Sequence, residues 1–282
     1  MDFSAISTML FTPATRPERF DKAKETQADG LVIDLEDAVE LSSKDSARKT
    51  VLDYLKSYKP DKNFLTCVRI NSIKTPSGLK DISALIDSEL RPDVLVLPKV
   101  EYAAEIQILD ELLSPKHVPY IVLLETARGL FNAKEILLAS KNVNAVVFGG
   151  GDLSADLGAE LAWEPMLNAR SVIVRAAANA AIAAFDVPYL NLKDTDDTKL
   201  IEETQRVKAL GYTGKLAIHP KQVKPIIETF MPPPQAVEHA KKIVEIYENS
   251  GGKVCEINGK MIDVPIYKSA KRVLALAKKT IQ

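Results

Sequence analysis

Eight short apolar segments recur along the chain and restrict it to a small number of folds. Each is rich in Val, Ile, Leu or Phe and mostly continuous, without an alternation of apolar and polar residues. Strands of this kind are buried on both faces, as in a parallel sheet that helices cover. The segments are STMLFTPA (7–14), GLVIDLE (30–36), FLTCVRIN (64–71), VLVLPKV (94–100), PYIVLLE (119–125), NAVVFGGGD (144–152), AIAAFDVP (181–188) and GKLAIHP (214–220).

The stretches between these segments place apolar residues three or four positions apart, which predicts helices. SSKDSARKTVLDYLKSY and GLKDISALIDSEL are two examples. Eight strand–helix units of roughly 25–35 residues each predict an α/β fold of the (β/α)8 TIM-barrel type. A doubly wound open sheet is the alternative, because periodicity alone cannot show whether a sheet closes.

The pattern changes at the Pro-rich segment MPPPQ (231–235). Beyond it the sequence predicts a helix, a hairpin with Asn258-Gly259 at its turn, and a final basic helix. We therefore expect a catalytic barrel over residues 1–228 and a C-terminal helix–hairpin–helix extension over residues 229–282. The extension is too short for a core of its own, so we expect it to pack on the barrel or on a neighbouring subunit.

The charge balance limits the partners of the chain. Lys and Arg number 37 against 38 Asp and Glu, a formal net charge of −1. Proteins that coat nucleic acid or an anionic membrane need a basic excess, so we expect neither partner. No apolar run approaches the roughly 18 residues of a membrane span, and the N-terminus does not resemble a signal peptide, so we expect a cytoplasmic protein. The widely spaced Cys67 and Cys255 argue against a disulfide framework or a zinc ribbon.

Ionisable or hydrogen-bonding residues follow seven of the eight apolar segments. The carboxyl ends of parallel barrel strands meet at one rim, so these side chains are expected to converge there. For any single residue the alternative is a charge that only marks where the strand reaches the surface. Surface turns favour Asp, Ser and Gly, however, and several of these residues are Arg, Lys or Glu. The residues are Glu36, Asp37, Arg69, Asn71, Lys99, Glu101, Glu125, Asp152, Asp186 and His219.

Glu125 and Asp152 are the candidate metal ligands. They follow consecutive segments, and Mg²⁺ prefers oxygen ligands and binds through one or two carboxylates together with water and substrate. The alternative for Asp152 is an N-cap of the segment LSADLG. The triple glycine 149–151 lacks the spacing of a dinucleotide fingerprint. We interpret it as backbone clearance beside a ligand, with Gly150 as a substrate-binding position.

Arg69 is the candidate anion clamp. Its planar guanidinium suits a substrate carboxylate, although an ion pair with Glu36 or Asp37 is an equally good interpretation. Arg16 and Lys22 flank the end of the first segment and are candidates for holding a phosphate group. Solvated surface charge is the competing interpretation for Lys22.

The chain resembles the family of citrate lyase β subunits and malyl-CoA or citramalyl-CoA lyases. The resemblance implies a TIM barrel that binds Mg²⁺ and cleaves or forms a carbon–carbon bond in a β-hydroxyacyl thioester of coenzyme A. It extends from residue 10 to about residue 272. The similar segments are LFTPATRPERFDKA, DGLVIDLEDAV, VRIN, LPKVE, LLETARGL, FGGGDLSADLG, GYTGKLAIHPKQV and GKMIDVPIYKSAKR.

The resemblance also implies roles for individual residues. The metal carboxylates fall on Glu125 and Asp152, and the arginine for the substrate carboxylate falls on Arg69. The acidic pair that supports the metal-bound waters falls on Glu36 and Asp37.

Asp263 in GKMIDVP matches an aspartate that a C-terminal lid brings to the site of an adjacent subunit. A lid that acts between subunits requires at least a dimer, and the resemblance implies a homotrimer. The intact C-terminal segment favours a stand-alone lyase that produces acetyl-CoA and a 2-oxo acid from citramalyl-CoA, malyl-CoA or citryl-CoA. The alternatives are a citrate lyase β subunit acting on citryl-acyl-carrier protein, a malate synthase-like condensing thioesterase, and a binding protein that kept the barrel.

Overall fold

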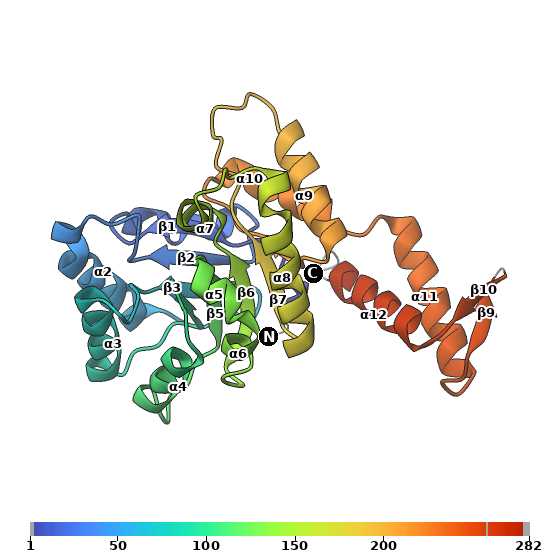
Figure 1. Ribbon diagram of the computed structural model, residues 1–282, viewed down its shortest axis with the longest axis horizontal. Helices are drawn as coiled ribbons and strands as arrows, with labels where there is room; N and C mark the ends of the chain where they lie inside the picture. Colours follow the sequence, from blue (N-terminus) through green and yellow to red (C-terminus); the bar gives the residue numbers. More distant parts are fainter. Residues whose placement is uncertain (1–2, 258, 279–282) are drawn as a thin grey trace.

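The computed structural model describes residues 3–257 and 259–278, so the predicted turn residue Asn258 lies outside it. Eight parallel strands form one sheet in the order β1 to β8 (Figure 1). Seven of them lie within the apolar segments, and β6 begins one residue before the sixth segment. The strands are β1 (Leu10–Pro13), β2 (Gly30–Asp34), β3 (Leu65–Arg69), β4 (Val94–Leu97), β5 (Tyr120–Leu124), β6 (Val143–Phe148), β7 (Ala183–Asp186) and β8 (Gly214–Lys215).

Backbone hydrogen bonds join the first and last strand regions of this sheet. Ala217 N–H donates to Met9 O at 2.9 Å, and Phe11 N–H donates to Ala217 O at 2.8 Å. Lys215 N–H donates to Ser7 O at 2.9 Å. The strand order runs in sequence without a reversal, so the alternative of a doubly wound sheet is wrong. The parallel eight-stranded α/β fold of the TIM-barrel family is confirmed.

Helices follow the strands and pack around the sheet (Figure 1). The longest of them, α8, has 18 residues. In the part of the chain that the structure describes, no helix is long and apolar enough to cross a membrane. The helices of the barrel are η1 (Phe3–Ala5), η2 (Pro17–Arg19), α1 (Lys22–Glu25), η3 (Leu41–Ser43), α2 (Lys44–Ser57), α3 (Pro76–Ser88), α4 (Ala103–Leu112), α5 (Ala127–Phe131), α6 (Ala133–Leu137), α7 (Gly150–Leu157), α8 (Trp163–Ala180), α9 (Thr198–Leu210) and α10 (Pro220–Phe230).

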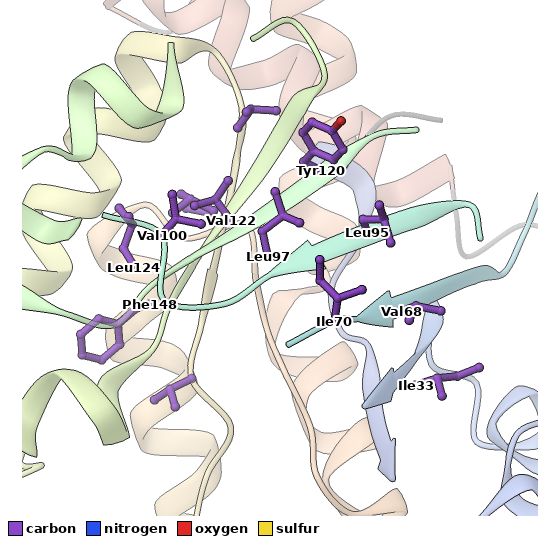
Figure 2. Packing of buried hydrophobic residues seen from close by; sticks show 14 of the residues in the cluster. Ile33, Val68, Ile70, Leu95, Leu97, Val100, Tyr120, Val122, Leu124 and Phe148 are labelled. Atoms are coloured by element: carbon purple, nitrogen blue, oxygen red, sulfur yellow. The ribbon is translucent and has the colours of Figure 1, made fainter. Parts of the chain in front are cut away.

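Two groups of buried apolar side chains form the barrel core, because successive residues of a strand point to opposite faces of the sheet. One group packs between strands and helices and includes Val122, Leu124 and Phe148 (Figure 2). The other fills the interior and includes Leu123 and Val147. A packed interior is characteristic of this architecture, so a ligand can bind only above it, at a barrel mouth.

Four further elements follow the barrel: α11 (Pro234–Asn249), β9 (Cys255–Ile257), β10 (Lys260–Ile262) and α12 (Val264–Lys278). Strands β9 and β10 pair antiparallel and stand apart from the eight-stranded sheet (Figure 1). A separate apolar cluster holds these elements together, and the rings of Tyr247 and Tyr267 stack within it at 4.6 Å.

Candidate active site

A cavity of about 450 Å³ opens at the carboxyl ends of the strands. Its charged lining residues are four carboxylates and one guanidinium, and most of the others are apolar. The lining residues are Phe11, Pro13, Asp34, Asp37, Ala38, Arg69, Leu123, Glu125, Val147, Phe148, Gly149, Gly151, Asp152, Val187, Pro188, Leu190, Leu216 and Ile218. The predicted convergence of distant segments on one rim is therefore confirmed for β2, β3, β5 and β6.

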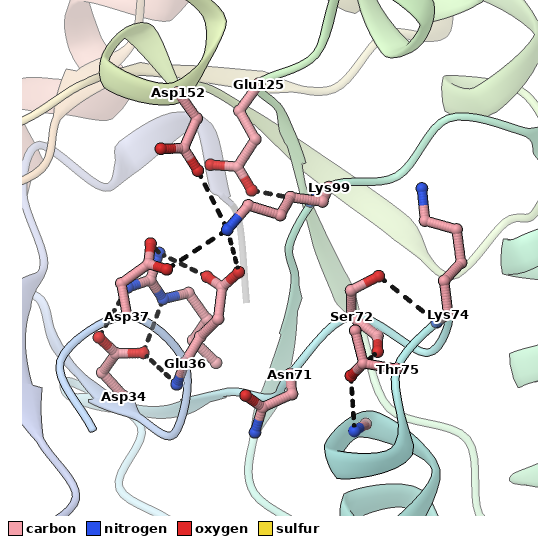
Figure 3. Close-up of polar contacts among 12 residues, drawn as sticks. Asp34, Glu36, Asp37, Asn71, Ser72, Lys74, Thr75, Lys99, Glu125 and Asp152 are labelled. Atoms are coloured by element: carbon pink, nitrogen blue, oxygen red, sulfur yellow. Dashed lines mark hydrogen bonds and ion pairs between the residues drawn. The ribbon is translucent and has the colours of Figure 1, made fainter. Parts of the chain in front are cut away.

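Lys99 lies at the centre of the acidic cluster (Figure 3). Its Nζ donates to Glu36 Oε1 at 2.7 Å and lies 3.3 Å from Asp37 Oδ1 and 3.1 Å from Asp152 Oδ2. Burial alone would lower the pKa of Lys99, but the hydrogen bond to Glu36 and the neighbouring carboxylates raise it overall. Lys99 was predicted only as a rim residue and not as a member of the site.

Arg69 forms a two-bond ion pair with Asp34. Its Nε donates to Asp34 Oδ1 at 2.7 Å and its Nη2 donates to Asp34 Oδ2 at 2.6 Å. The remaining Nη1 lies 3.0 Å from Glu36 Oε2 and 3.5 Å from Asp37 Oδ2, and the bond to Glu36 lacks hydrogen-bond geometry. The predicted alternative of ion pairs with Glu36 and Asp37 is confirmed, but the main partner, Asp34, was not predicted.

Side-chain hydrogen bonds to the backbone fix the loop that carries Glu36 and Asp37. Lys44 Nζ donates to Leu35 O at 2.7 Å and to Glu36 O at 2.5 Å. Asn71 Nδ2 donates to Leu35 O at 3.0 Å. These bonds tie the end of β2 to the start of α2 and the end of β3, so the acidic pair has a fixed direction toward Lys99.

Glu125 follows β5 and is buried, with 4% of its surface exposed. Its Oε1 accepts a hydrogen bond from Lys99 N–H at 2.7 Å. A Cβ at Gly149 would lie 2.3 Å from Glu125 Cβ, so only glycine leaves room there for this side chain. Burial, followed by the nearby charge of Glu36, raises the pKa of Glu125 to about 8.

The donor set fits a divalent cation. Glu125 and Asp152 come from the ends of β5 and β6, and their carboxylates lie side by side (Figure 3). Burial also raises the pKa of Glu36. Glu36 and Glu125 are therefore two buried acids whose negative charge is not fully offset by the nearby cations. Residues 3–257 and 259–278 contain no group of three or more His, Cys, Asp or Glu that could hold a metal. Two carboxylates with open positions suit Mg²⁺, which retains water and substrate ligands.

One interpretation of the glycine-rich segment is wrong. Asp152 does not cap α7, because it lies inside the first turn and the N-cap is Gly149. Close packing is found at two of the three glycines: a Cβ would meet Glu125 at Gly149, and the ring of Phe148 and the side chain of Leu161 at Gly150. Gly150 is not among the residues that line the cavity, and its substrate-binding role stays a prediction.

Arg16, Lys22 and Asp263 lie outside the cavity. Arg16 Nε donates to Glu18 Oε1 at 2.6 Å, and Lys22 is exposed on α1. Asp263 Oδ1 accepts from Ile266 N–H at 3.1 Å at the start of α12. This segment adjoins the β9–β10 hairpin, far from the barrel mouth of its own chain (Figure 1).

Acidic side chains, an arginine paired with Asp34 and one lysine lie together at the carboxyl ends of the parallel strands. This arrangement defines a class of barrel proteins with an acidic site that suits a metal ion. Residues 7–220 match the family described as HpcH/HpaI aldolase/citrate lyase, so the chain belongs to that family. Residues 163–279 also match a family described as C-C bond lyase of the TIM-barrel fold.

Several curated proteins are similar over most of their length. The chain is 34% identical to the citrate lyase subunit beta of Leuconostoc mesenteroides subsp. cremoris, covering 96% of this chain and 92% of that protein. It is 30% identical to the mitochondrial citramalyl-CoA lyase of Homo sapiens, covering 95% and 84%. It is 29% identical to the L-malyl-CoA/beta-methylmalyl-CoA lyase of Cereibacter sphaeroides, covering 95% and 93%.

A solved structure has the same fold over nearly the whole chain. It is the protein CitE from Mycobacterium tuberculosis in complex with magnesium, acetoacetate and coenzyme A. The two chains are 30% identical, with a TM-score of 0.79 and coverage of 98% of this chain and 99% of that one.

Proposed function

We propose that the protein is a Mg²⁺-dependent carbon–carbon lyase that cleaves a β-hydroxyacyl thioester of coenzyme A. The paired carboxylates of Glu125 and Asp152 beside Arg69, all lining one cavity, are the observation on which this function rests. Relatives named as citramalyl-CoA, malyl-CoA and citrate lyase proteins support it, as does the neighbour crystallised with magnesium and coenzyme A. The products would be acetyl-CoA and a 2-oxo acid.

The reaction is a retro-Claisen cleavage. The hydroxyl group loses its proton, and the bond between the carbinol carbon and the α carbon breaks. The electron pair passes to the thioester enolate, and protonation of the enolate carbon gives the acetyl thioester. A magnesium ion held by Glu125 and Asp152 would supply Lewis acidity for the hydroxyl and carboxylate oxygens.

Each residue of the site then has a distinct task. Asp34 fixes two donors of Arg69, and the remaining guanidinium donors bind the substrate carboxylate and stabilise negative charge. Glu36 and Asp37 would accept hydrogen bonds from water molecules bound to a metal at Glu125 and Asp152. The ammonium group of Lys99 holds the carboxylates of Glu36, Asp37 and Asp152 close together.

Protonation of the enolate carbon is assigned to Asp263 of a neighbouring protomer. Its place on the extension, away from the cavity of its own chain, supports action between subunits (Figure 1). The protein would then work as a homo-oligomer, for which we propose a trimer. Residues 1–228 form the catalytic barrel and residues 229–282 the lid. Arg16 and Lys22 remain candidates for the phosphate groups of coenzyme A, outside the acyl cavity.

Two alternatives use the same site. The first is a citrate lyase β subunit acting on citryl-acyl-carrier protein. The similarity to such a subunit covers 96% of this chain, so the presence of the extension does not separate the two. The second is a malate synthase-like condensing thioesterase, which releases free coenzyme A, whereas a lyase releases acetyl-CoA.

We expect Glu125→Gln and Asp152→Asn each to lower the rate of Mg²⁺-dependent cleavage at least about 100-fold, because each removes an anionic metal ligand. The measurement is mass spectrometry of the products from citramalyl-CoA, malyl-CoA and citryl-CoA, with Mg²⁺ or with EDTA. Glu135→Gln, at an exposed position of α6, is the matched control. Full activity of Glu125→Gln in EDTA would contradict the metal role.

A further inference from the structure

The cavity has two chemically different halves. The charged lining residues all come from the ends of β2, β3, β5 and β6. The ends of β7, β8 and β1 contribute only apolar lining residues, namely Phe11, Pro13, Val187, Pro188, Leu190, Leu216 and Ile218. A bound molecule with one charged and one apolar end therefore has only one favourable orientation.

The floor beneath the metal carboxylates is also apolar. Leu123 precedes Glu125 by two residues on β5, so both side chains face the barrel axis. Val147 stands in the same relation to Gly149. Both belong with Leu216 to the buried cluster that fills the barrel interior. The part of the floor formed by Leu123, Val147 and Leu216 therefore offers only hydrocarbon to a group that projects toward it.

Arg69 is the only cationic residue that lines the cavity in the described part of the chain. Two of its nitrogens donate to Asp34, and its guanidinium carbon lies 5.0 Å from the ring centre of Phe11. It can therefore pair with one substrate carboxylate. Lys99 stands at the charged half, already among three carboxylates. Arg69 borders the apolar half at Phe11, and the lining residues from the ends of β7 and β8 include no cation.

We propose that the apolar half and floor receive the substituent on the hydroxyl-bearing carbon, and that this substituent is a small alkyl group rather than a carboxymethyl group. The cleavage reaction to which this selectivity applies rests on the proposed function. A carboxylate in the apolar half would lose its water without gaining a cation, which is strongly unfavourable. The site thus selects 2-oxo acids of the pyruvate type over oxaloacetate.

Binding of free 2-oxo acids tests the selection without any cleavage. Calorimetric titration of the full chain in Mg²⁺ is expected to give a Kd at least tenfold lower for pyruvate and 2-oxobutyrate than for fresh oxaloacetate. If the apolar half contacts only the coenzyme A arm, the three acids bind alike. Equal or tighter binding of oxaloacetate overturns the proposal.

A positive charge added to the apolar half should weaken the preference for pyruvate over oxaloacetate. Leu190 lines the cavity and is 50% exposed, so Leu190→Lys can add a cation there without burying it. We expect the ratio of its Kd for oxaloacetate to its Kd for pyruvate to fall at least fivefold relative to the wild-type protein. Leu192→Lys is the control, since Leu192 is 42% exposed and does not line the cavity. Identical oxaloacetate affinity in both variants contradicts the assignment.

Cleavage assays separate this proposal from the proposed function. Wild-type protein is expected to cleave citramalyl-CoA with a kcat/KM at least 100-fold higher than that for citryl-CoA. Efficient cleavage of citryl-CoA, with tight oxaloacetate binding, preserves the lyase and removes the selection. Failure to cleave any of the thioesters, with selective pyruvate binding, removes the lyase and preserves the selection.

Discussion

Glu125 combines a buried carboxyl group with an acidic neighbourhood. Its position after β5 and the glycine at position 149 leave it little freedom to turn toward solvent. Burial and the charge of Glu36 raise its pKa to about 8, far above the ordinary 4.5. At neutral pH the metal-free protein therefore keeps this carboxyl group mostly protonated, and a bound cation would favour loss of the proton.

This raised pKa predicts how stability depends on pH. Between pH 4.5 and about 8 the folded protein keeps the proton of Glu125 while the unfolded chain has lost it. The free energy of unfolding in EDTA should therefore fall as pH rises through this range, by at most about 1.4 kcal/mol per pH unit. Urea denaturation at pH 5, 6, 7 and 8 measures the slope. Glu125→Gln should flatten it, and an unchanged slope contradicts this prediction.

At the residue scale the sequence located the site but not its pairing. It indicated Glu36, Asp37 and Arg69 because charged residues after apolar runs are conspicuous. Asp34 was missed because it is the last residue of β2 and is hidden within an apolar run. Lys99 was missed because a single lysine after a strand gives no sign of which carboxylates it meets across the barrel mouth.

At the element scale, a buried charge network joins β7, β8 and α9. Lys215 is fully buried, and its Nζ donates to Asp186 Oδ2 at 2.7 Å, to Val187 O at 2.6 Å and to Glu203 Oε1 at 2.6 Å. Arg170 Nε donates to the other oxygen of Asp186 at 2.9 Å. The network anchors the chain at the point where the apolar wall of the cavity begins.

Removal of Lys215 should therefore damage the barrel. We expect Lys215→Met to lower the free energy of unfolding by about 3–5 kcal/mol, because it removes a buried cation shared by Asp186 and Glu203 and leaves Asp186 paired with Arg170 alone. Lys199→Met is the control: Lys199 is 69% exposed and 3.7 Å from Asp194, so a change below about 1 kcal/mol is expected. Chemical denaturation measures both. Equal effects of the two variants would contradict a structural role for the network.

Elements were easier to predict than their ends. All eight strands overlap the apolar segments, since burial on both faces leaves a clear pattern, and only β6 starts one residue outside its segment. The glycine-rich end of the sixth segment proved to be the start of α7 instead. Glycines carry no side-chain pattern, so neither helical nor extended periodicity could assign them.

At the scale of the whole molecule, the proposed site is incomplete in one chain. Asp263 lies between β10 and α12, while Glu125 lines the cavity at the carboxyl ends of the barrel strands. The β9–β10 hairpin stands apart from the barrel (Figure 1). If the catalytic aspartate comes from a neighbour, two different inactive variants can restore each other within one oligomer.

Mixed oligomers of Glu125→Gln and Asp263→Asn subunits test this arrangement. In a random equal mixture, half of the sites keep Glu125 and half of those receive an intact Asp263, so about one quarter of wild-type activity should return. Each variant alone should stay inactive. Different affinity tags verify that the subunits have mixed, and mixed oligomers without activity would contradict action between subunits.

The contact between β1 and the β8 region also has a consequence for biosynthesis. The first strand leaves the ribosome early, but its second neighbour, around Ala217, is made only after three quarters of the chain. Until then the backbone N–H and C=O groups along one edge of β1 lack their native hydrogen-bond partners. The barrel thus completes its ring only late in translation, and earlier intermediates must tolerate an open seam.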